Sequence, residues 1–218
     1  AAISGSTLYK ADILALRNEG FSTENIVTEL TTSDVRNACD LFMPTFLESN
    51  HIDGRVSIEV DPRLAYNTEG TITQGKHLYS LVNRPNLLIK VPATLDGLPA
   101  IEELTAQGIS INVTLIFSVE RYEAVMDAYL RGLERRIGNG LPVSEIHSVA
   151  SFFISRIDAD IDKKLDAMAQ NHPLRGKAAI ANAVIAYSAY LKVVNSHRWQ
   201  KIAERGGNMQ RPLWASRS

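Results

Sequence analysis

Short apolar runs alternate with amphipathic stretches along most of the chain, and this alternation predicts its elements. Five runs rich in β-branched and other apolar residues are typical of strands buried on both faces. These predicted strands are Arg55–Val60, Leu87–Val91, Ile109–Phe117, Ile146–Ile154 and, more weakly, Pro212–Ser216.

Apolar residues at helical spacing fill the segments between these runs. The clearest segment opens with Ser118, repeats apolar residues at i, i+3 and i+4, and stops at Gly138. The helices expected after the first strand are Thr68–Val82 (with Thr68 as its N-cap), Leu98–Ala106, Ser118–Ile137, Asp158–Met168, Lys177–Val194 and a short turn at Trp199–Ala203. Those expected before it are Leu8–Arg17, Thr23–Leu30 and Ser33–Leu47, the last capped by Ser33 and Asp34.

The regular alternation of strands and helices predicts an α/β protein with a parallel sheet and right-handed crossovers. A doubly wound sheet and a (β/α)8 barrel both satisfy this pattern. No glycine-rich phosphate loop follows a strand, and polar residues stand within or at the ends of several strands, which favours the barrel. A closed barrel of this kind needs eight strands, and only five are visible. Either strands are missing from this chain or the barrel interpretation is wrong.

Composition and charge narrow the class of protein. Of the 218 residues, 45% are hydrophobic and 22% charged, as in ordinary soluble proteins, and the net charge of −1 gives no field toward nucleic acid or a membrane. No run reaches the length of a membrane span, and the first residues do not resemble a signal peptide. The single cysteine, Cys39, is expected to be buried, and no Cys/His spacing suggests a metal. A cytoplasmic protein without a metal fits these features.

Two charged residues within predicted strands are the first candidates for chemistry. Lys90 lies among Leu88, Ile89 and Val91, and a lysine there must lose its charge, find a partner or reach a cavity. Desolvation favours the neutral amine, which is the nucleophile that attacks a carbonyl. Glu59 is a carboxylate in an otherwise apolar strand. The alternatives are that Lys90 lies at the exposed end of its strand, or that the two residues form a purely structural ion pair.

Further polar residues cluster in the third and fourth predicted strands. Asn112 and Thr114 are two residues apart, so alternation places them on one face, with Val113 and Leu115 on the other. The candidates near the end of the fourth strand are Ser151, Phe153 and Arg156, and Ser216 ends the fifth. Arg156 suits a phosphate, since its guanidinium offers several donors, although a surface ion pair with Asp158 or Asp160 is an alternative.

These residues stand in motifs that together resemble the transaldolase family. The matching segments run in the same order through the whole chain: VSIEVDPRLAYNT, LLIKVPATLDGLPAI, GISINVTLIFSVERY, IHSVASFFISRIDADID, RGKAAIANAVIAY and RPLWAS. The resemblance is to the bacterial transaldolases whose seventh strand reads PLWAS, and it implies a (β/α)8 barrel.

The resemblance also implies roles for the candidate residues. Lys90 would form the Schiff base. Glu59 would be the acid that works with a bound water, which Thr114 orients. The remaining roles are substrate binding: Asn112 would hold the dihydroxyacetone hydroxyls, Ser151 and Phe153 would line the pocket, and Arg156 and Ser216 would help to bind phosphate.

The implied reaction belongs to the pentose phosphate pathway and needs no metal or coenzyme, because the imine is the electron sink. A dihydroxyacetone unit moves between sugar phosphates, from sedoheptulose 7-phosphate or fructose 6-phosphate to glyceraldehyde 3-phosphate or erythrose 4-phosphate. The partners expected are these sugar phosphates, with neither nucleic acid nor membrane, in a monomer or homodimer.

The chain departs from the family at both ends. The family's first strand, with a catalytic aspartate, and its second, with an asparagine, have no counterpart here, and the eighth strand is also missing. Residues 1–218 would then be a single barrel domain that is incomplete at both ends, with the five strands as the third to the seventh of the barrel. This chain alone is expected to fold poorly and to show little activity. After Ser216 the sequence departs from the pattern usual in the family, so we assign Arg217 no role in phosphate binding.

Two alternatives remain. One is a Schiff-base aldolase that cleaves fructose 6-phosphate without transfer, against which Glu59 argues, because the smaller family members of that kind use a tyrosine in place of this acid and its water. The other is an inactive barrel that binds sugar phosphates, which the missing first-strand aspartate favours.

Overall fold

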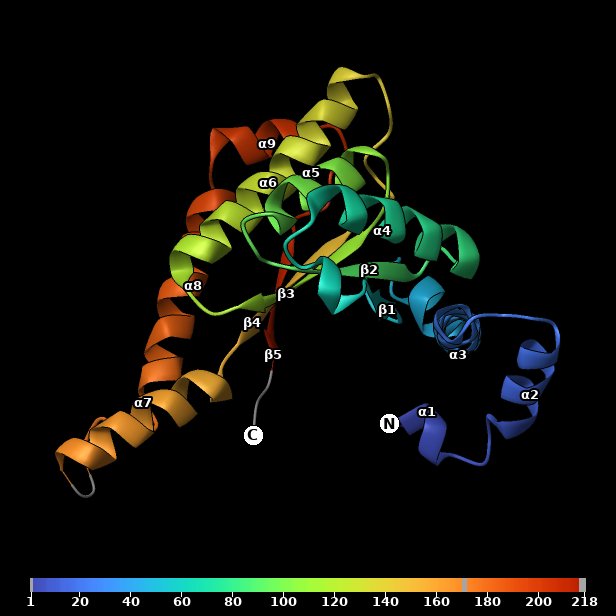
Figure 1. Ribbon diagram of the computed structural model, residues 1–218. Coiled ribbons are helices and arrows are strands. Elements are labelled where there is room, and N and C mark those ends of the chain that lie inside the picture. Colours follow the sequence, from blue (N-terminus) through green and yellow to red (C-terminus); the bar gives the residue numbers. More distant parts are fainter. Residues whose placement is uncertain (1, 170–171, 216–218) are drawn as a thin grey trace. The chain divides into compact units, whose positions relative to one another are not determined.

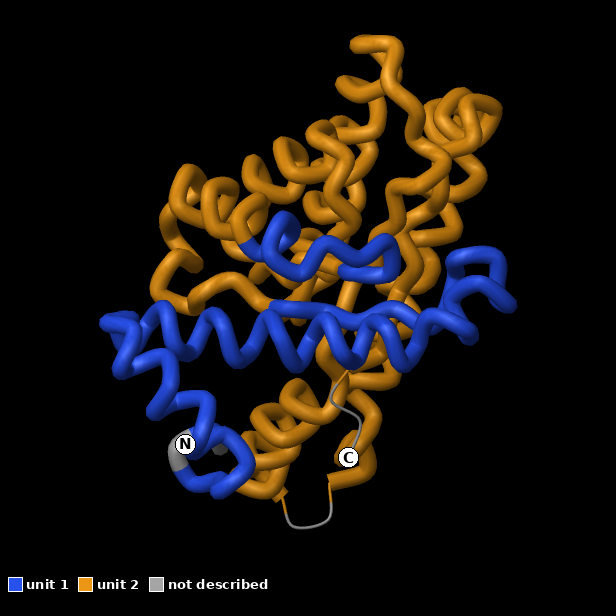
Figure 2. The backbone as a smooth tube through the Cα atoms, turned by 90° about the vertical axis from the view of Figure 1, so that its right-hand side faces the viewer, with its two compact units in different colours: residues 1–58, 78–87 blue, residues 59–77, 88–218 orange. Residues whose placement is uncertain are grey.

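The computed structural model describes residues 2–169 and 172–215, and divides into two compact units. Unit 1 comprises residues 1–58 and 78–87, and unit 2 comprises residues 59–77 and 88–218 (Figure 2). The chain crosses between the units within α4 (Thr68–Val82) and near the strands β1 (Val56–Glu59) and β2 (Leu87–Pro92). The single domain expected from the sequence stays a prediction.

Unit 1 is built mainly of helices. These are α1 (Ala2–Gly5), α2 (Lys10–Asn18) and α3 (Thr23–Glu48). The sequence prediction of two helices with a break at Ser33–Asp34 is wrong, because α3 continues through these residues without interruption. Ser22 is the cap, accepting a hydrogen bond from the amide of Asn25 at 3.2 Å, and the Asp34 carboxylate accepts one from the hydroxyl of Tyr9 at 2.7 Å.

A buried amide ties α3 to the rest of unit 1. The side chain of Asn86 is fully buried and donates to the carbonyl oxygens of Cys39, at 2.8 Å, and Gly54, at 2.9 Å. Arg84 pairs with Asp40 at 2.5 Å on the surface nearby. Cys39 is 0% exposed, which confirms the burial expected for it.

The described strands form one five-stranded sheet in the order β1-β2-β3-β4-β5. The remaining strands are β3 (Ile111–Ile116), β4 (Ser148–Phe153) and β5 (Arg211–Ala215), and β2 to β5 pair in parallel. Spatial order follows chain order, so every crossover proceeds in the same direction. A doubly wound sheet would reverse its strand order at a switch point, and none occurs within the described strands. The winding is that of a barrel.

Helices follow each of the strands β1 to β4. They are η1 (Pro62–Leu64, a 3₁₀ turn), α4, α5 (Gly97–Ala106), α6 (Val119–Gly138), α7 (Ser155–Met168), α8 (Ala178–Val194) and α9 (His197–Ala203). The predicted strands and helices after residue 55 are thus confirmed, with bounds shifted by at most three residues. The cap at the start of α4 differs from the prediction, which gave Thr68. Asn67 accepts a hydrogen bond from the amide of Gly70 at 2.9 Å, whereas the Thr68 hydroxyl donates to the carbonyl of Asp96.

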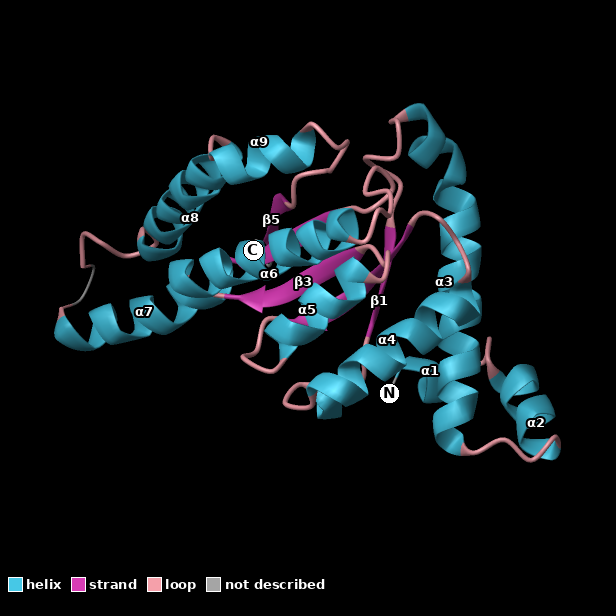
Figure 3. Ribbon diagram, turned by 90° about the horizontal axis from the view of Figure 1, so that it is seen from above, coloured by secondary structure: helices cyan, strands magenta, loops and turns pink. Residues whose placement is uncertain are grey.

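One face of the sheet packs against helices α5 and α6, which lie on the same side of β3 and β4 (Figures 1 and 3). The side chains on this face alternate along the strands and are all 0% exposed: Ile89, Val91, Ile111, Val113, Ile116, Ala150 and Phe152. Phe152 meets Tyr122 of α6 edge to face, with ring centroids 5.9 Å apart. Residues between these positions therefore point to the opposite face, and they include the candidates of the next section.

Candidate active site

Lys90 and Glu59 meet on the sheet face opposite α5 and α6. The backbone amide of Val60 donates to the carbonyl of Lys90 at 3.1 Å, which fixes the end of β1 beside the middle of β2. The Lys90 ammonium nitrogen lies 3.2 Å from Oε2 of Glu59. The two side chains are 31% and 46% exposed, so water reaches the pair. This arrangement agrees with two of the interpretations left open by the sequence, a working lysine–acid pair and a structural ion pair. Lys90 lies within β2 and not at its end.

Asn112, Thr114 and Ser151 continue the same face beside Lys90. Lys90 stands opposite Asn112 in the parallel register, and Pro92 stands opposite Thr114. The Ser151 hydroxyl donates to Oδ1 of Asn112 at 2.8 Å. All three residues are at most 9% exposed. A row of polar side chains therefore runs from Lys90 on β2 across β3 to β4, and its members on β3 and β4 are buried.

A bulge interrupts β3 directly after Thr114. Val113 pairs with Ala150 and Ile116 pairs with Phe152. Two residues of β3 therefore lie between these pairs where β4 has only one, so β3 carries one extra residue. Leu115 lies at φ 60° and is 42% exposed. The prediction that Leu115 shares the face of Val113 is therefore wrong, because Ile116 takes the next buried position on that face. Strict alternation along the apolar run gives no sign of this extra residue.

The bulge brings an aromatic residue to the end of this row that the sequence analysis missed. The ring centroids of Phe117 and Phe153 lie 5.2 Å apart, and the guanidinium carbon of Arg156 lies 4.9 Å from the centroid of Phe153. Arg156 forms no surface pair with Asp158 or Asp160. Asp158 accepts instead from the amide of Ala179, and Asp160 pairs with Lys164 at 2.6 Å.

The structure brings together Lys90 with Glu59, Asn112 with Ser151, and Phe153 with Arg156, while Thr114 lies in register beside β2. Ser216, predicted to help bind phosphate, lies outside the described residues, as does Arg217. Within residues 2–169 and 172–215, no group of three or more His, Cys, Asp or Glu side chains is arranged to hold a metal ion.

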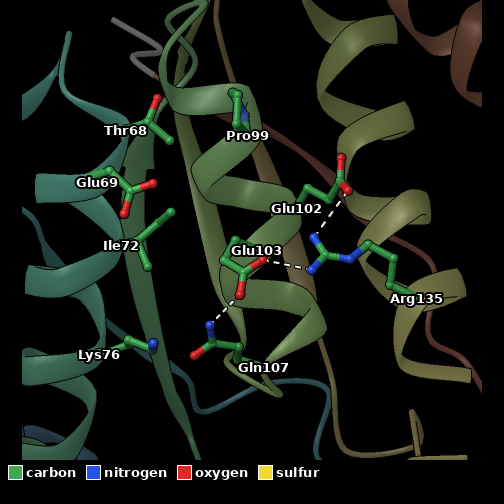
Figure 4. A pocket seen from close by; sticks show the side chains of 9 residues that line it. All are labelled: Thr68, Glu69, Ile72, Lys76, Pro99, Glu102, Glu103, Gln107 and Arg135. Atoms are coloured by element: carbon green, nitrogen blue, oxygen red, sulfur yellow. Dashed lines mark hydrogen bonds and ion pairs between the residues drawn. The ribbon is translucent and has the colours of Figure 1, made fainter. Parts of the chain in front are cut away.

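A separate groove of about 450 Å³ lies on the helical side, between α4, α5 and α6 (Figure 4). Its charged residues are largely engaged with one another, since Arg135 reaches Glu102 at 3.2 Å and Glu103 at 2.8 Å. Glu103 also accepts from the side chain of Gln107, as Figure 4 shows. None of the candidate residues lines this groove, so it is not part of the candidate site.

Among the described helices, none taken singly has the length and apolar character needed to cross a membrane. The bent pair α8 and α9 meets the requirement only when both helices are counted together, on length and composition alone.

A singly wound parallel sheet, with helices on one face and a row of polar side chains on the other, defines a protein of the βα-barrel class, in which strands supply the functional groups. Sequence comparison identifies the family within this class. The model of the transaldolase/fructose-6-phosphate aldolase family matches residues 1–205, and the chain belongs to that family.

Comparison with individual named proteins supports the same family. The chain is 55% identical over 218 residues to a transaldolase of an Arthrobacter species, covering 99% of this chain and 59% of that protein. It is 53% identical over 218 residues to a transaldolase of Mycolicibacterium smegmatis, with the same coverage of 99% and 59%. Transaldolase 2 of Streptomyces coelicolor is 52% identical over 217 residues, covering 99% of this chain and 58% of that protein.

The predicted family and (β/α)8 fold class are thereby confirmed, and the described residues supply five parallel-wound strands of that fold. The chain spans about three fifths of the length of the curated relatives that it matches. The assignment of its strands as the third to the seventh of the barrel stays a prediction, as do the roles of the individual site residues.

Proposed function

We propose that the protein to which this sequence belongs is a transaldolase that transfers a dihydroxyacetone unit between sugar phosphates through a Schiff base on Lys90. The observation that carries the proposal is the contact of 3.2 Å between the Lys90 nitrogen and the Glu59 carboxylate on the polar face of the sheet. Membership of the family and relatives named transaldolase at 52–55% identity support the same activity.

The first half of the reaction forms the imine. A proton passes from the Lys90 ammonium to a base, and Glu59 lies within hydrogen-bonding distance to accept it. The free amine attacks the ketone carbon of the donor, giving a carbinolamine that loses its hydroxyl as water. Glu59 and Thr114 handle these protons through a water molecule. A base then removes the proton of the C4 hydroxyl and the C3–C4 bond breaks. C4 becomes the aldehyde carbon of the departing aldose phosphate, and the electron pair of the broken bond moves into the iminium to give an enamine.

The second half reverses these steps on another aldehyde. The enamine carbon attacks the carbonyl carbon of the acceptor, whose oxygen takes up a proton, and water then hydrolyses the imine to release the new ketose and regenerate Lys90. No electrons are lost or gained overall. The hydroxyls of the three-carbon unit bind to the Asn112–Ser151 pair, since that pair offers an amide and a hydroxyl 2.8 Å apart on the same face.

The phosphate of the substrate binds beside Arg156, whose guanidinium lies over Phe153 without a pairing to Asp158 or Asp160. Local charge is needed for this, because the net charge of −1 does not attract an anion to the chain as a whole. The proposal includes the finer expectations from the sequence: sugar phosphates as partners, a cytoplasmic location, and a monomer or homodimer.

Dependence of the product on an acceptor tests the function. The protein is incubated with fructose 6-phosphate, with and without erythrose 4-phosphate, and products are followed by mass spectrometry. A transaldolase forms sedoheptulose 7-phosphate only with the acceptor present. Free dihydroxyacetone released at full rate without an acceptor would identify an aldolase instead, and binding without any product would identify an inactive barrel.

A further inference from the structure

The extra residue in β3 determines which side chains reach the candidate site. Leu115 occupies the left-handed backbone region at φ 60°, which glycine adopts freely but L-residues other than asparagine and aspartate rarely adopt. Its own side chain is 42% exposed, so packing of that side chain does not account for the conformation. Strained backbone of this kind persists where the surrounding structure holds it, and it clusters at functional sites.

The consequence of the bulge is the position of Phe117. In an unbroken strand, Phe117 would share the helix-facing side with Val113, because the two are four residues apart. The bulge moves Ile116 onto that side, where it is 0% exposed, and turns Phe117 toward Phe153. The side-chain amide of Asn182 on α8 donates to the carbonyl of Phe117 at 2.8 Å and holds the backbone there.

We propose that Phe117 is a positioning residue for the phosphate-binding guanidinium of Arg156, acting through Phe153. This inference rests on the proposed function. The centroid of Phe153 lies 5.2 Å from that of Phe117 and 4.9 Å from the guanidinium carbon of Arg156, so Phe153 contacts both residues. A ring that is held by a second ring keeps one orientation, and the cation above its face then loses less freedom when it binds a phosphate.

The test is a pair of substitutions at one position. Phe117→Leu removes the ring and keeps an apolar side chain, whereas Phe117→Tyr keeps the ring. The KM for fructose 6-phosphate is expected to rise in Phe117→Leu by up to about two- to fivefold, with kcat nearly unchanged. The full value of an exposed cation–π contact sets this ceiling, because Phe153 itself remains under Arg156. Phe117→Tyr should behave as the unsubstituted protein. Circular dichroism of both variants checks that they are folded.

Two further measurements test whether the effect of Phe117→Leu on KM depends on the substrate phosphate and on Arg156, as a positioning role requires. With unphosphorylated fructose as donor, Phe117→Leu and the unsubstituted protein should have equal KM values, because no phosphate is present to bind. In a double-mutant cycle with Arg156→Gln, which itself should raise the KM for fructose 6-phosphate on the order of tenfold or more, adding Phe117→Leu should have no additional effect.

The proposal is overturned if Phe117→Leu leaves the KM for fructose 6-phosphate unchanged, changes both donors alike, or adds its full effect to that of Arg156→Gln. These outcomes are distinct from a failure of the proposed function, in which the unsubstituted protein itself would form neither product nor a borohydride-trapped adduct.

Discussion

Two buried tyrosines on α6 differ in whether their hydroxyl groups have partners. Tyr122 and Tyr129 are both 0% exposed. The Tyr129 hydroxyl donates to the carbonyl of Asn208 at 2.8 Å, but the Tyr122 hydroxyl has no hydrogen-bond partner among the described residues. Burial also raises the pKa of Tyr122 well above its usual value, since it disfavours the phenolate.

These two tyrosines form a matched pair for a stability measurement. Tyr122→Phe is expected to leave the free energy of unfolding unchanged or raise it, because it removes an unsatisfied polar atom. Tyr129→Phe should lower the free energy by about 1 kcal/mol, the usual net contribution of one hydrogen bond, and leave the Asn208 carbonyl without this donor. Urea unfolding of the two variants checks the difference, and equal losses would contradict it.

The thiol of Cys39 gives a prediction that depends on pH. Burial raises its pKa from 9.0 to about 11. Because the pKa is higher in the folded protein than in the unfolded chain, the neutral thiol stabilises the folded state relative to the thiolate. This stabilisation by the neutral thiol is complete below pH 9 and is lost as the pH rises toward 11. At pH 8, iodoacetamide is expected to label Cys39 only after unfolding in urea, as measured by intact mass. Equal labelling of the folded protein would contradict the burial.

At the scale of residues, the sequence predicted Lys90, Glu59, Asn112 and Ser151 as separate candidates, because polar side chains are rare in buried strands. The family resemblance then joined them into one site. It could not predict Phe117, since alternation assigns that residue to the wrong face. A single bulge inverts the assignment of every later residue in a strand, and the conformation of Leu115 has no signature in its residue type.

At the scale of elements, the contact of α5 with α6 depends on a residue without a side chain. A Cβ atom at Gly132 would lie 2.5 Å from Cβ of Thr105 and 2.7 Å from the carbonyl of Glu102. Ion pairs hold the same two helices at the surface, where Arg131 reaches Glu102 at 2.6 Å. The arginine side chains of α6 therefore join this helix to α5.

Gly132→Ala is therefore expected to destabilise the protein by about 1–3 kcal/mol, the typical cost of overpacking, although alanine favours a helix. Gly138→Ala is the matched control on the same helix, because a Cβ atom there has no neighbour within 4 Å. Thermal unfolding of both variants measures the difference. A Gly132→Ala variant as stable as the control would show that the helices can separate at little cost.

Helix boundaries illustrate why some elements were predicted less well than others. The periodicity of α6 is strong and Ser118 caps it as expected, accepting from the amide of Arg121 at 3.1 Å. In α3, Ser33 and Asp34 resemble a cap by residue type, yet Asp34 is engaged by Tyr9 from a distant part of unit 1. Tertiary contacts of this kind override the local preference of the sequence.

At the scale of the whole molecule, the described sheet ends at β1 and β5, each of which has one neighbouring strand. The (β/α)8 fold of the family closes such edges, which otherwise leave backbone groups open to pairing with other chains. The singly wound order was predictable from the βα alternation, whereas a sequence pattern cannot show how the sheet closes.

The 218 residues expressed alone are therefore expected to associate through their strand edges and to show little transaldolase turnover. Sedimentation velocity measures the association, and the acceptor-dependent assay measures the turnover, with a full-length transaldolase of Mycolicibacterium smegmatis as the reference. A monomer of the 218-residue chain with full turnover would contradict the need for further strands.

The central claim is that the amine of Lys90 forms an imine with the ketose. The protein is treated with fructose 6-phosphate and borohydride, digested, and mapped by mass spectrometry, beside Lys90→Arg and a control variant at an exposed lysine, Lys76→Arg. The account predicts a reduced dihydroxyacetone adduct on Lys90 in the unsubstituted protein and in Lys76→Arg, and none in Lys90→Arg. An adduct that persists in Lys90→Arg, or none on Lys90 in a folded and otherwise complete protein, would contradict it.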